Sequence, residues 1–140
     1  MQDRYLFKAK RKDDGELVFG GLSYCEKTNA YFITNMGKDH ISYIGFHQEV
    51  DSNTICQCTG LKDKNGKLIW ENDICRRVLL PTKRIKTNFK IAYVPYKCCI
   101  SAIDLDGSNI TFLSDYINNQ YEVEVIGNIF DNPELLEVGE

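Results

Sequence analysis

The sequence predicts an all-β protein in which a β-barrel or β-sandwich follows a smaller β unit. Short runs rich in β-branched and aromatic residues recur along the chain and are separated by turn-forming residues. No long segment shows the 3.6-residue apolar period of a helix. Many short strands with closely spaced turns are typical of sandwiches and barrels. We place a β unit over residues 1–53 and the barrel domain over 54–140, with an acidic tail at its end.

The first half of the chain predicts short strands over 5–10, 17–19, 22–25 and 31–34. Turns are expected at Asp13-Asp14-Gly15 and at 27–29, and Gly20-Gly21 is expected to break or bulge the strand that contains it. Residues 35–40 are polar and loop-like. Residues 41–50 show no clear period and are left without an assignment.

The second half is more regular, and Asp106-Gly107 predicts a hairpin turn within it. Pro81 is expected to end a strand, with 82–88 as a basic loop after it, and 114–118 as an irregular turn or single helical turn. Strands are expected over 54–58, 67–70, 74–80, 89–93, 99–105, 110–113 and 121–129.

The segment 58–76 combines a tight turn with the start of a β run. Asn65-Gly66 is a pair that readily adopts positive φ in a tight reversal, so we expect a surface turn there. Trp70 and Ile74 are expected in the core beside it.

Three carboxylates, Asp63, Glu71 and Asp73, lie close together in this segment. They could hold a metal ion or contact a phosphate. Acidic side chains around an Asn-Gly turn more often cap backbone amides or remain solvated, and we favour that interpretation.

Composition excludes several classes of protein. The chain has 140 residues, 43% of them hydrophobic and 11% aromatic, which is enough for a packed interior. No apolar run approaches the roughly 20 residues that span a bilayer, and the first residues lack the apolar core of a secretion signal. We therefore expect a soluble cytoplasmic protein without membrane contact.

The net charge of −3 hides a division of charge along the chain. A segment from 76 to 90 carries six cations and no acid, whereas every charged residue after Lys97 is acidic. The basic strip could bind nucleic acid, or it could face the acidic part of its own or a neighbouring chain. We favour the self-complementary arrangement and a homo-oligomer. The strip consists of Arg76, Arg77, Lys83, Arg84, Lys86 and Lys90.

Six cysteines are present, and the missing secretion signal predicts reduced thiols rather than disulfides. Cys56 and Cys58 would share one face of a strand and fill its core side. Zinc is the alternative, but the CxC and CC spacings differ from the paired CxxC knuckles of zinc sites. We expect structural core cysteines and no metal.

Candidates for catalysis are few. Cys98-Cys99 has no base next to it in the sequence, and His40 and His47 are isolated. No phosphate-binding glycine loop or nucleophile elbow is present. We expect no enzyme activity and no cofactor.

Two segments carry a resemblance to the YopX family of phage and prophage proteins. The first runs from 49 to 74 and is similar to the pattern T-x-G-Q-Y-T-G-L-x-D-x-N-G-x-x-I-Y-E-G-D-I; the second, VIGNIFDNPELL over 125–136, is similar to V-I-G-N-I-x-x-N-P-E-L-L. Cys56, Cys58 and Asn72 depart from the first pattern, and the start of the chain is only loosely similar to the family's F-R-A-W-D opening. The matching residues of the first pattern are Thr54, Gln57, Thr59, Gly60, Leu61, Asp63, Asn65, Gly66, Ile69, Glu71, Asp73 and Ile74.

The resemblance implies an SH3-like barrel and an origin in a phage or prophage, hence a bacterial host cytoplasm. It supplies no catalytic residue. Two functions remain as hypotheses: an accessory protein that contacts itself and a host or phage protein, or a small barrel that binds nucleic acid through the basic strip.

Overall fold

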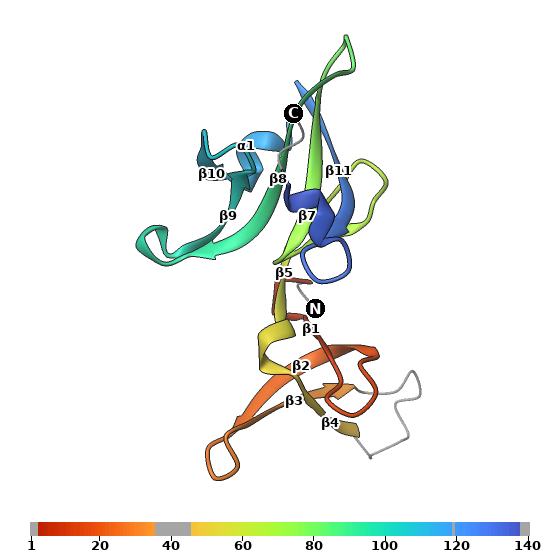
Figure 1. Cartoon of the computed structure of the whole chain (residues 1–140), viewed down its shortest axis with the longest axis vertical. Helices are drawn as coiled ribbons and strands as arrows, with labels where there is room; N and C mark the ends of the chain where they lie inside the picture. Colours follow the sequence, from red (N-terminus) through yellow and green to blue (C-terminus); the bar gives the residue numbers. More distant parts are fainter. Residues whose placement is uncertain (1–2, 36–45, 119, 138–140) are drawn as a thin grey trace. The chain divides into compact units, whose positions relative to one another are not determined.

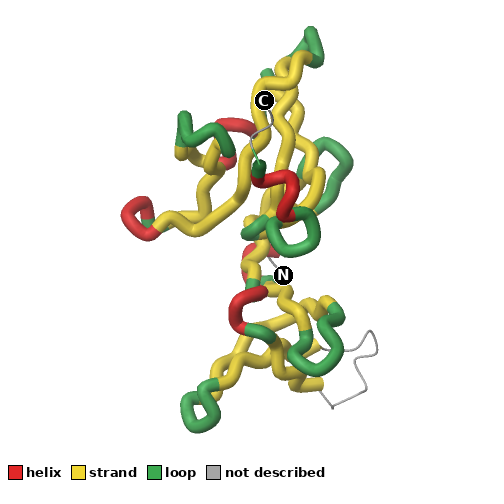
Figure 2. The backbone as a smooth tube through the Cα atoms, viewed as in Figure 1, coloured by secondary structure: helices red, strands yellow, loops and turns green. Residues whose placement is uncertain are grey.

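The computed structural model describes residues 3–35, 46–118 and 120–137, and within them the protein is all-β, as predicted (Figures 1 and 2). The chain forms two compact units, Met1–Cys58 and Thr59–Glu140, and the division falls within strand β5 (Cys56–Lys62). The boundary expected between 53 and 54 lies in the short 3-10 turn η2 (Ser52–Thr54) before this strand.

The first unit is an antiparallel sheet in which the strands follow the order β4-β3-β2-β1-β5. A 3-10 turn, η1 (Asp3–Tyr5), precedes it. The region 41–50, left without an assignment from the sequence, contains β4 over its described part, and 36–45 lie outside the described residues. The strands are β1 (Phe7–Lys10), β2 (Leu17–Cys25), β3 (Ala30–Asn35) and β4 (Phe46–Val50).

The Gly20-Gly21 pair does not break β2, so the expected break is wrong. The strand continues through the pair but changes partner there, pairing with β1 up to Gly20 and with β3 from Gly21. A Cβ atom on Gly20 would lie 2.1 Å from the backbone oxygen of Thr34. Glycine is needed because the backbone of β3 approaches so closely.

The core of the first unit centres on the fully or nearly fully buried Ala9, Ile33 and Val50. These residues lie on β1, β3 and β4. Because successive side chains of a strand point to opposite faces, these three cover one face of the sheet and bury it. The segment after β1 also reaches β4, because Lys12 N donates to Glu49 O at 3.0 Å. Partly buried side chains pack around this centre: Phe7, Val18, Leu22, Tyr31 and Ile55.

The second unit contains a five-stranded antiparallel sheet with the order β10-β9-β8-β7-β11, and a hairpin of β5 with β6 (Leu68–Trp70). Neither sheet of the described chain closes on itself, so the SH3-like barrel stays a prediction. A 3-10 turn, η3 (Pro95–Lys97), joins β8 to β9, and another, η4 (Pro133–Leu136), follows the last strand. The strands are β7 (Asp73–Leu79), β8 (Arg84–Val94), β9 (Cys99–Asp104), β10 (Ile110–Phe112) and β11 (Tyr121–Asn128).

The predicted basic loop over 82–88 is wrong for most of its length. Strand β8 begins at Arg84, so only a short turn that includes Lys83, at φ 54°, follows Pro81. The strand extends this far because β7 continues beside it, past a bulge after Arg77. Pairing with β7 therefore makes a strand of the polar segment that begins at Arg84, although several of its residues have low β propensity.

The core of the second unit is larger and includes the single helical turn expected near 114, which is α1 (Leu113–Tyr116). Leu113 and Tyr116 of this turn cover the sheet, and the rings of Phe89 and Tyr116 meet edge to face at 4.9 Å. The buried members are Ile69, Cys75, Phe89, Ile91, Ala102, Leu113, Tyr116 and Val123.

Candidate functional site

The turn that carries the first signature is joined to β11 by Asp63. One carboxylate oxygen, Oδ1, accepts hydrogen bonds from the backbone N–H groups of Asn65 and Lys67, both at 2.9 Å. The other oxygen, Oδ2, accepts from Val125 N at 3.0 Å. The adjacent Lys64 N donates to Val123 O at 2.9 Å. The turn thus satisfies backbone groups on the outer side of β11.

The surroundings of Asp63 set its charge state. Burial of the carboxyl group acts to raise its pKa, but the N–H donors of Val125, Lys67 and Asn65, with the charge of Lys67, lower the pKa below its usual value. A carboxylate that accepts several backbone N–H bonds is stabilised in its ionised form. Asp63 is therefore a structural anion, as the capping interpretation expects.

The remaining signature residues of this segment also have structural positions. Asp73 is buried, and its Oδ2 accepts from Trp70 N at 2.9 Å. Thr59 Oγ1 donates to Ile69 O at 2.7 Å. Gly60 and Gly66 both have a backbone φ of 80°. Glu71 is half-buried at the corner before β7. No group of three or more His, Cys, Asp or Glu in the described part of the chain is placed to hold a metal ion.

The second signature forms a compact turn after β11. Asn128 Oδ1 accepts from the backbone N–H groups of Phe130 and Asp131, at 3.0 and 2.9 Å. Asn132 Oδ1 accepts from Asn128 N at 3.2 Å, and a Cβ on Gly127 would lie 2.5 Å from that oxygen. Glycine and two asparagines are needed because the chain turns back on itself within a few residues.

Asn72 links the two signatures. It stands at φ 69°, where the sequence pattern has glycine, and asparagine tolerates that region. Its backbone N–H donates to Ile91 O at 2.7 Å, and its carbonyl accepts from Ile129 N at 3.0 Å. The corner expected at this position therefore persists.

The structure separates the basic strip. Arg76 and Arg77 are neighbours on one strand, so they lie on opposite faces of the sheet. Arg76 is paired across the strands with Asn88 and Glu124, whereas Arg77 is paired with Thr87 and Val123.

The other basic residues follow the same hairpin. Lys90 is opposite Ile74 and therefore shares the face of Arg76, and Arg84 is opposite Leu79. Lys83 and Arg84 are exposed at the β7–β8 turn, and Lys86 lies in β8. The strip is therefore not one continuous surface.

Part of the acidic segment is used within the fold. Glu122 and Glu124 lie on β11, directly beside β7, and both contact the amino group of Lys64, at 3.9 and 3.6 Å. These two acids therefore pair with a lysine that lies outside the basic strip.

Arg77 lies between two aromatic rings. Its guanidinium carbon is 3.9 Å from the ring centroid of Tyr116 and 4.8 Å from that of Tyr121. Cations are attracted to the faces of aromatic rings at such distances. Arg77 is the one residue of the basic strip that the structure places in an aromatic environment among the described cation–ring contacts.

Tyr116, whose ring faces Arg77, is bonded to a buried carboxylate, Asp104. Its Oδ1 accepts from the hydroxyl of Tyr116 at 2.8 Å, and its Oδ2 accepts from Ser108 Oγ at 3.2 Å and Asn109 Nδ2 at 3.3 Å. Burial and the Asp104 carboxylate raise the pKa of Tyr116 to about 12, so its hydroxyl stays protonated as a donor. No local sequence pattern indicates this network, since Asp104 and Tyr116 come together only through the packing of α1 on β9.

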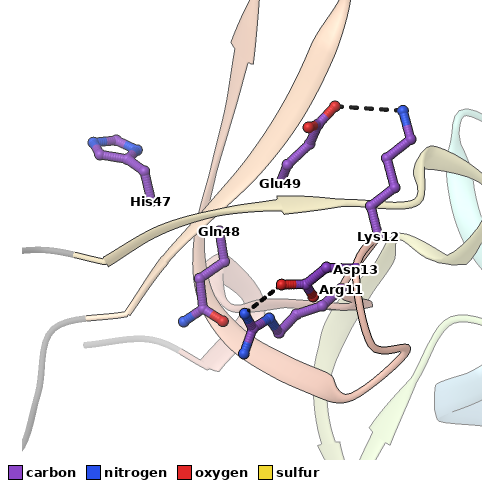
Figure 3. A pocket seen from close by; sticks show the side chains of 6 residues that line it. All are labelled: Arg11, Lys12, Asp13, His47, Gln48 and Glu49. Carbon is purple, nitrogen blue, oxygen red and sulfur yellow. Dashed lines mark hydrogen bonds and ion pairs between the residues drawn. The ribbon is translucent and has the colours of Figure 1, made fainter.

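A polar cavity of about 660 Å³ opens on the first unit between the turn after β1 and strand β4 (Figure 3). Its charged residues pair with one another: Arg11 with Asp13 at 2.7 Å, and Lys12 with Glu49 at 3.4 Å. His47 points to the other side of β4 from Gln48 (Figure 3) and lies 3.2 Å from Thr34 Oγ1 through Nδ1. His40 lies outside the described residues.

The cysteines are free thiols; three of them are core residues, as predicted, but the prediction is wrong for the exposed Cys98. Cys56, Cys58 and Cys75 are buried, and the first two lie on one face of β5. Cys98 is exposed, while Cys25 and Cys99 are partly buried.

Large exposed apolar side chains gather at the edge strand β10. Ile110 and Phe112 lie on one face of this strand, and Phe112 is 54% exposed. Lys97 reaches them from η3, donating to Ile110 O at 3.0 Å and lying 5.4 Å from the Phe112 ring centroid. Tyr96, next to Lys97, is also exposed. We call Tyr96, Lys97, Ile110 and Phe112 the β10 surface.

Together these features define an all-β protein whose signature residues hold its turns. The YopX protein family model matches residues 6–137, so the chain belongs to the YopX family. No curated protein matches the chain significantly. Among the described residues, no helix has the length and hydrophobicity that a membrane span requires.

Proposed function

We propose that this YopX family member is a phage or prophage accessory protein that acts through protein–protein contacts and self-associates through the β10 surface. The carrying observation is the exposed apolar pair Ile110 and Phe112 on an edge strand. Edge strands with exposed apolar side chains are prone to pair with another chain. A second copy, and a host or phage protein in the cytoplasm of the bacterium, are the partners that we propose.

Charge has a smaller part in this proposal. Because Glu122 and Glu124 contact Lys64 within the chain, fewer acids are left to meet cations of a second copy. Exposed ion pairs contribute only about 0–1 kcal/mol each. We therefore expect apolar contacts to hold the oligomer and charge to adjust its orientation.

Light scattering coupled to size exclusion tests the proposal at low and high salt. Wild type is expected to be larger than a monomer at both, and Phe112→Glu is expected to be monomeric, because a charge would be placed in the apolar contact. Tyr5→Glu is the matched control, since Tyr5 is 56% exposed in the first unit; it should associate as wild type does. A monomeric wild type at both salt concentrations would contradict the proposal.

Nucleic-acid binding is the second candidate, and the exposed Lys83 and Arg84 at the β7–β8 turn favour it. Their charges are available at a projecting turn, where phosphates could approach. Retention on single-stranded DNA or RNA at low salt, lost steeply as salt rises, would support this function. Retention that is equal for wild type and Arg84→Gln would argue against it.

We also infer that the second unit is a partly open SH3-like barrel. The β5–β6 turn contacts the outer side of β11 through Lys64 N and Val123 O, which extends the sheet at one edge. An experimental structure in which β5 and β6 lie away from β11 would contradict this inference.

A further inference from the structure

Arg77 is held in a fixed orientation inside the second unit. Strand β7 fixes its backbone, and the rings of Tyr116 and Tyr121, 3.9 and 4.8 Å from its guanidinium carbon, restrict the plane of the group. Tyr116 is itself fixed, because its hydroxyl is bonded to the buried Asp104. An arginine oriented in this way loses little side-chain entropy when it binds a ligand.

The side-chain donors of Arg77 are not used by the residues that the structure describes. Its Nε, like that of Arg76, is buried and has no hydrogen-bond partner. No ion pair or side-chain hydrogen bond joins Arg77 to another residue in 3–35, 46–118 or 120–137. Arg77 as a whole is partly exposed, so part of its side chain is open to solvent. A buried donor without a partner is costly, and an acceptor that reached it would remove that cost.

The carboxylates of Asp104 and Asp106 are engaged elsewhere. Asp104 accepts three hydrogen bonds, from Tyr116, Ser108 and Asn109, and Asp106 accepts from Ser108 N at 2.8 Å. Neither forms an ion pair with Arg77. The carboxylates of Asp104 and Asp106 therefore accept no hydrogen bond from the guanidinium group of Arg77.

We propose that Arg77 is an anion-binding residue whose ligand is a phosphate group. The planar fork of a guanidinium matches two phosphate oxygens, and such charge-assisted pairs are strong. Arg84 adds positive charge on the same face, because both Arg84 and Tyr121 are opposite Leu79. The phosphate could belong to a free phosphate compound or to the backbone of a single-stranded nucleic acid.

Binding measurements on the full chain test this proposal. Inorganic pyrophosphate, followed by calorimetry, probes the free source, and a fluorescein-labelled single-stranded oligothymidylate, followed by anisotropy, probes the nucleic-acid source. Arg77→Gln is expected to weaken binding of the accepted probe by roughly tenfold or more. Arg77→Lys keeps the charge but loses the fork, so it should fall between wild type and Arg77→Gln.

Arg76→Gln is the matched control, because Arg76 lies on the opposite face of β7 and also has a buried Nε without a partner, but none of the described cation–ring contacts involves it. It should bind as wild type does. Thermal unfolding shows whether each variant is folded. If Arg77→Gln does not fold, the comparison of Arg77→Lys with wild type still tests the proposal.

The outcomes separate this inference from the proposed function. Binding of pyrophosphate alone, weakened by Arg77→Gln, supports the site and assigns it to a free phosphate compound. Binding of the oligothymidylate with the same dependence assigns it to nucleic acid. The inference would be overturned if wild type bound neither probe. It would also be overturned if Arg76→Gln and Arg77→Gln weakened binding equally. Phe112→Glu should bind phosphate normally, whatever its oligomeric state.

Discussion

The carboxylate of Asp63 and the backbone N–H of Val125 are joined by a 3.0 Å hydrogen bond across 62 residues of sequence. The bond connects the turn after β5 to strand β11, and therefore the two segments by which the chain resembles its family. Because the same carboxylate also holds Asn65 N and Lys67 N, one side chain closes the turn and fixes it to the sheet.

Replacement of Asp63 by Asn is expected to destabilise the second unit by about 2 kcal/mol. The amide cannot present acceptors to all three N–H groups, and its own N–H₂ would face one of the donors. Urea unfolding followed by circular dichroism measures the loss. Asp13→Asn, at an exposed carboxylate in the first unit, is the control and should change stability little. Equal effects of the two substitutions would show that the bond to Val125 contributes nothing.

The lowered pKa of Asp63 predicts an acid-dependent loss of stability. The folded pKa lies below the usual 3.8, so ionised Asp63 stabilises the fold fully above that value, and the stability is lost as pH falls through the folded pKa. Unfolding free energies measured from neutral pH down to below pH 3.8 should fall more steeply for wild type than for Asp63→Asn. Identical slopes would contradict this assignment.

Gly127→Ala should destabilise the protein by about 1–3 kcal/mol. The new methyl would lie 2.5 Å from Asn132 Oδ1 and 2.9 Å from Leu135 Cδ1, and Asn132 is held by its bond to Asn128 N. Gly21→Ala is a matched control, since nothing lies within 4 Å of its Cβ position. The control should leave the melting temperature nearly unchanged, whereas a similar fall in both variants would point to loss of glycine flexibility instead.

Trp70→Ala is expected to cost ~3–5 kcal/mol, the usual range for removing a buried tryptophan. Trp70 and Ile74 are both buried, as the sequence predicts. Since Trp70 is the only tryptophan, its fluorescence reports on this site directly, and its emission should shift to longer wavelength on unfolding. An unchanged melting temperature for Trp70→Ala would show that Trp70 is a surface residue.

The cysteines should react with iodoacetamide in a definite order. Cys98 is exposed and should be alkylated first. Cys75 should react only after unfolding, because burial and the charges of Asp73 and Asp63 raise the pKa of its thiol and leave little reactive thiolate. Mass spectrometry of native and urea-unfolded samples measures the order. Cys98→Ser should remove the fast phase, and rapid native labelling of Cys75 would contradict the burial.

Most of the strands follow from alternation and turn chemistry, which are local properties of the sequence. Asn65-Gly66 and the runs that flank it predict a hairpin because positive φ is needed at the turn and apolar residues are needed beside it. The capping role of Asp63 also follows from its place two residues before Asn65. Its bond to Val125 does not, since nothing local specifies which distant strand comes next to the turn.

Pairing between strands decided the features that the sequence mispredicted. Gly20 reads as a strand breaker, but here it permits the close approach of Thr34. Residues after Arg84 read as a basic loop, but β7 continues beside them and supplies hydrogen-bond partners. Local propensity is weak beside a ladder of backbone hydrogen bonds that a neighbouring strand provides.

The sequence alone determined the all-β class, the turns, the buried cysteines of β5 and family membership, because each depends on residue type at short spacing. Only the tertiary structure decided where the charges lie. Arg76 and Arg77 are adjacent in sequence, yet the two-residue period of a strand sends one to the face of Glu124 and the other between Tyr116 and Tyr121. Those tyrosines reach Arg77 through a helical turn and an edge strand that are distant in sequence, so their meeting is a consequence of packing.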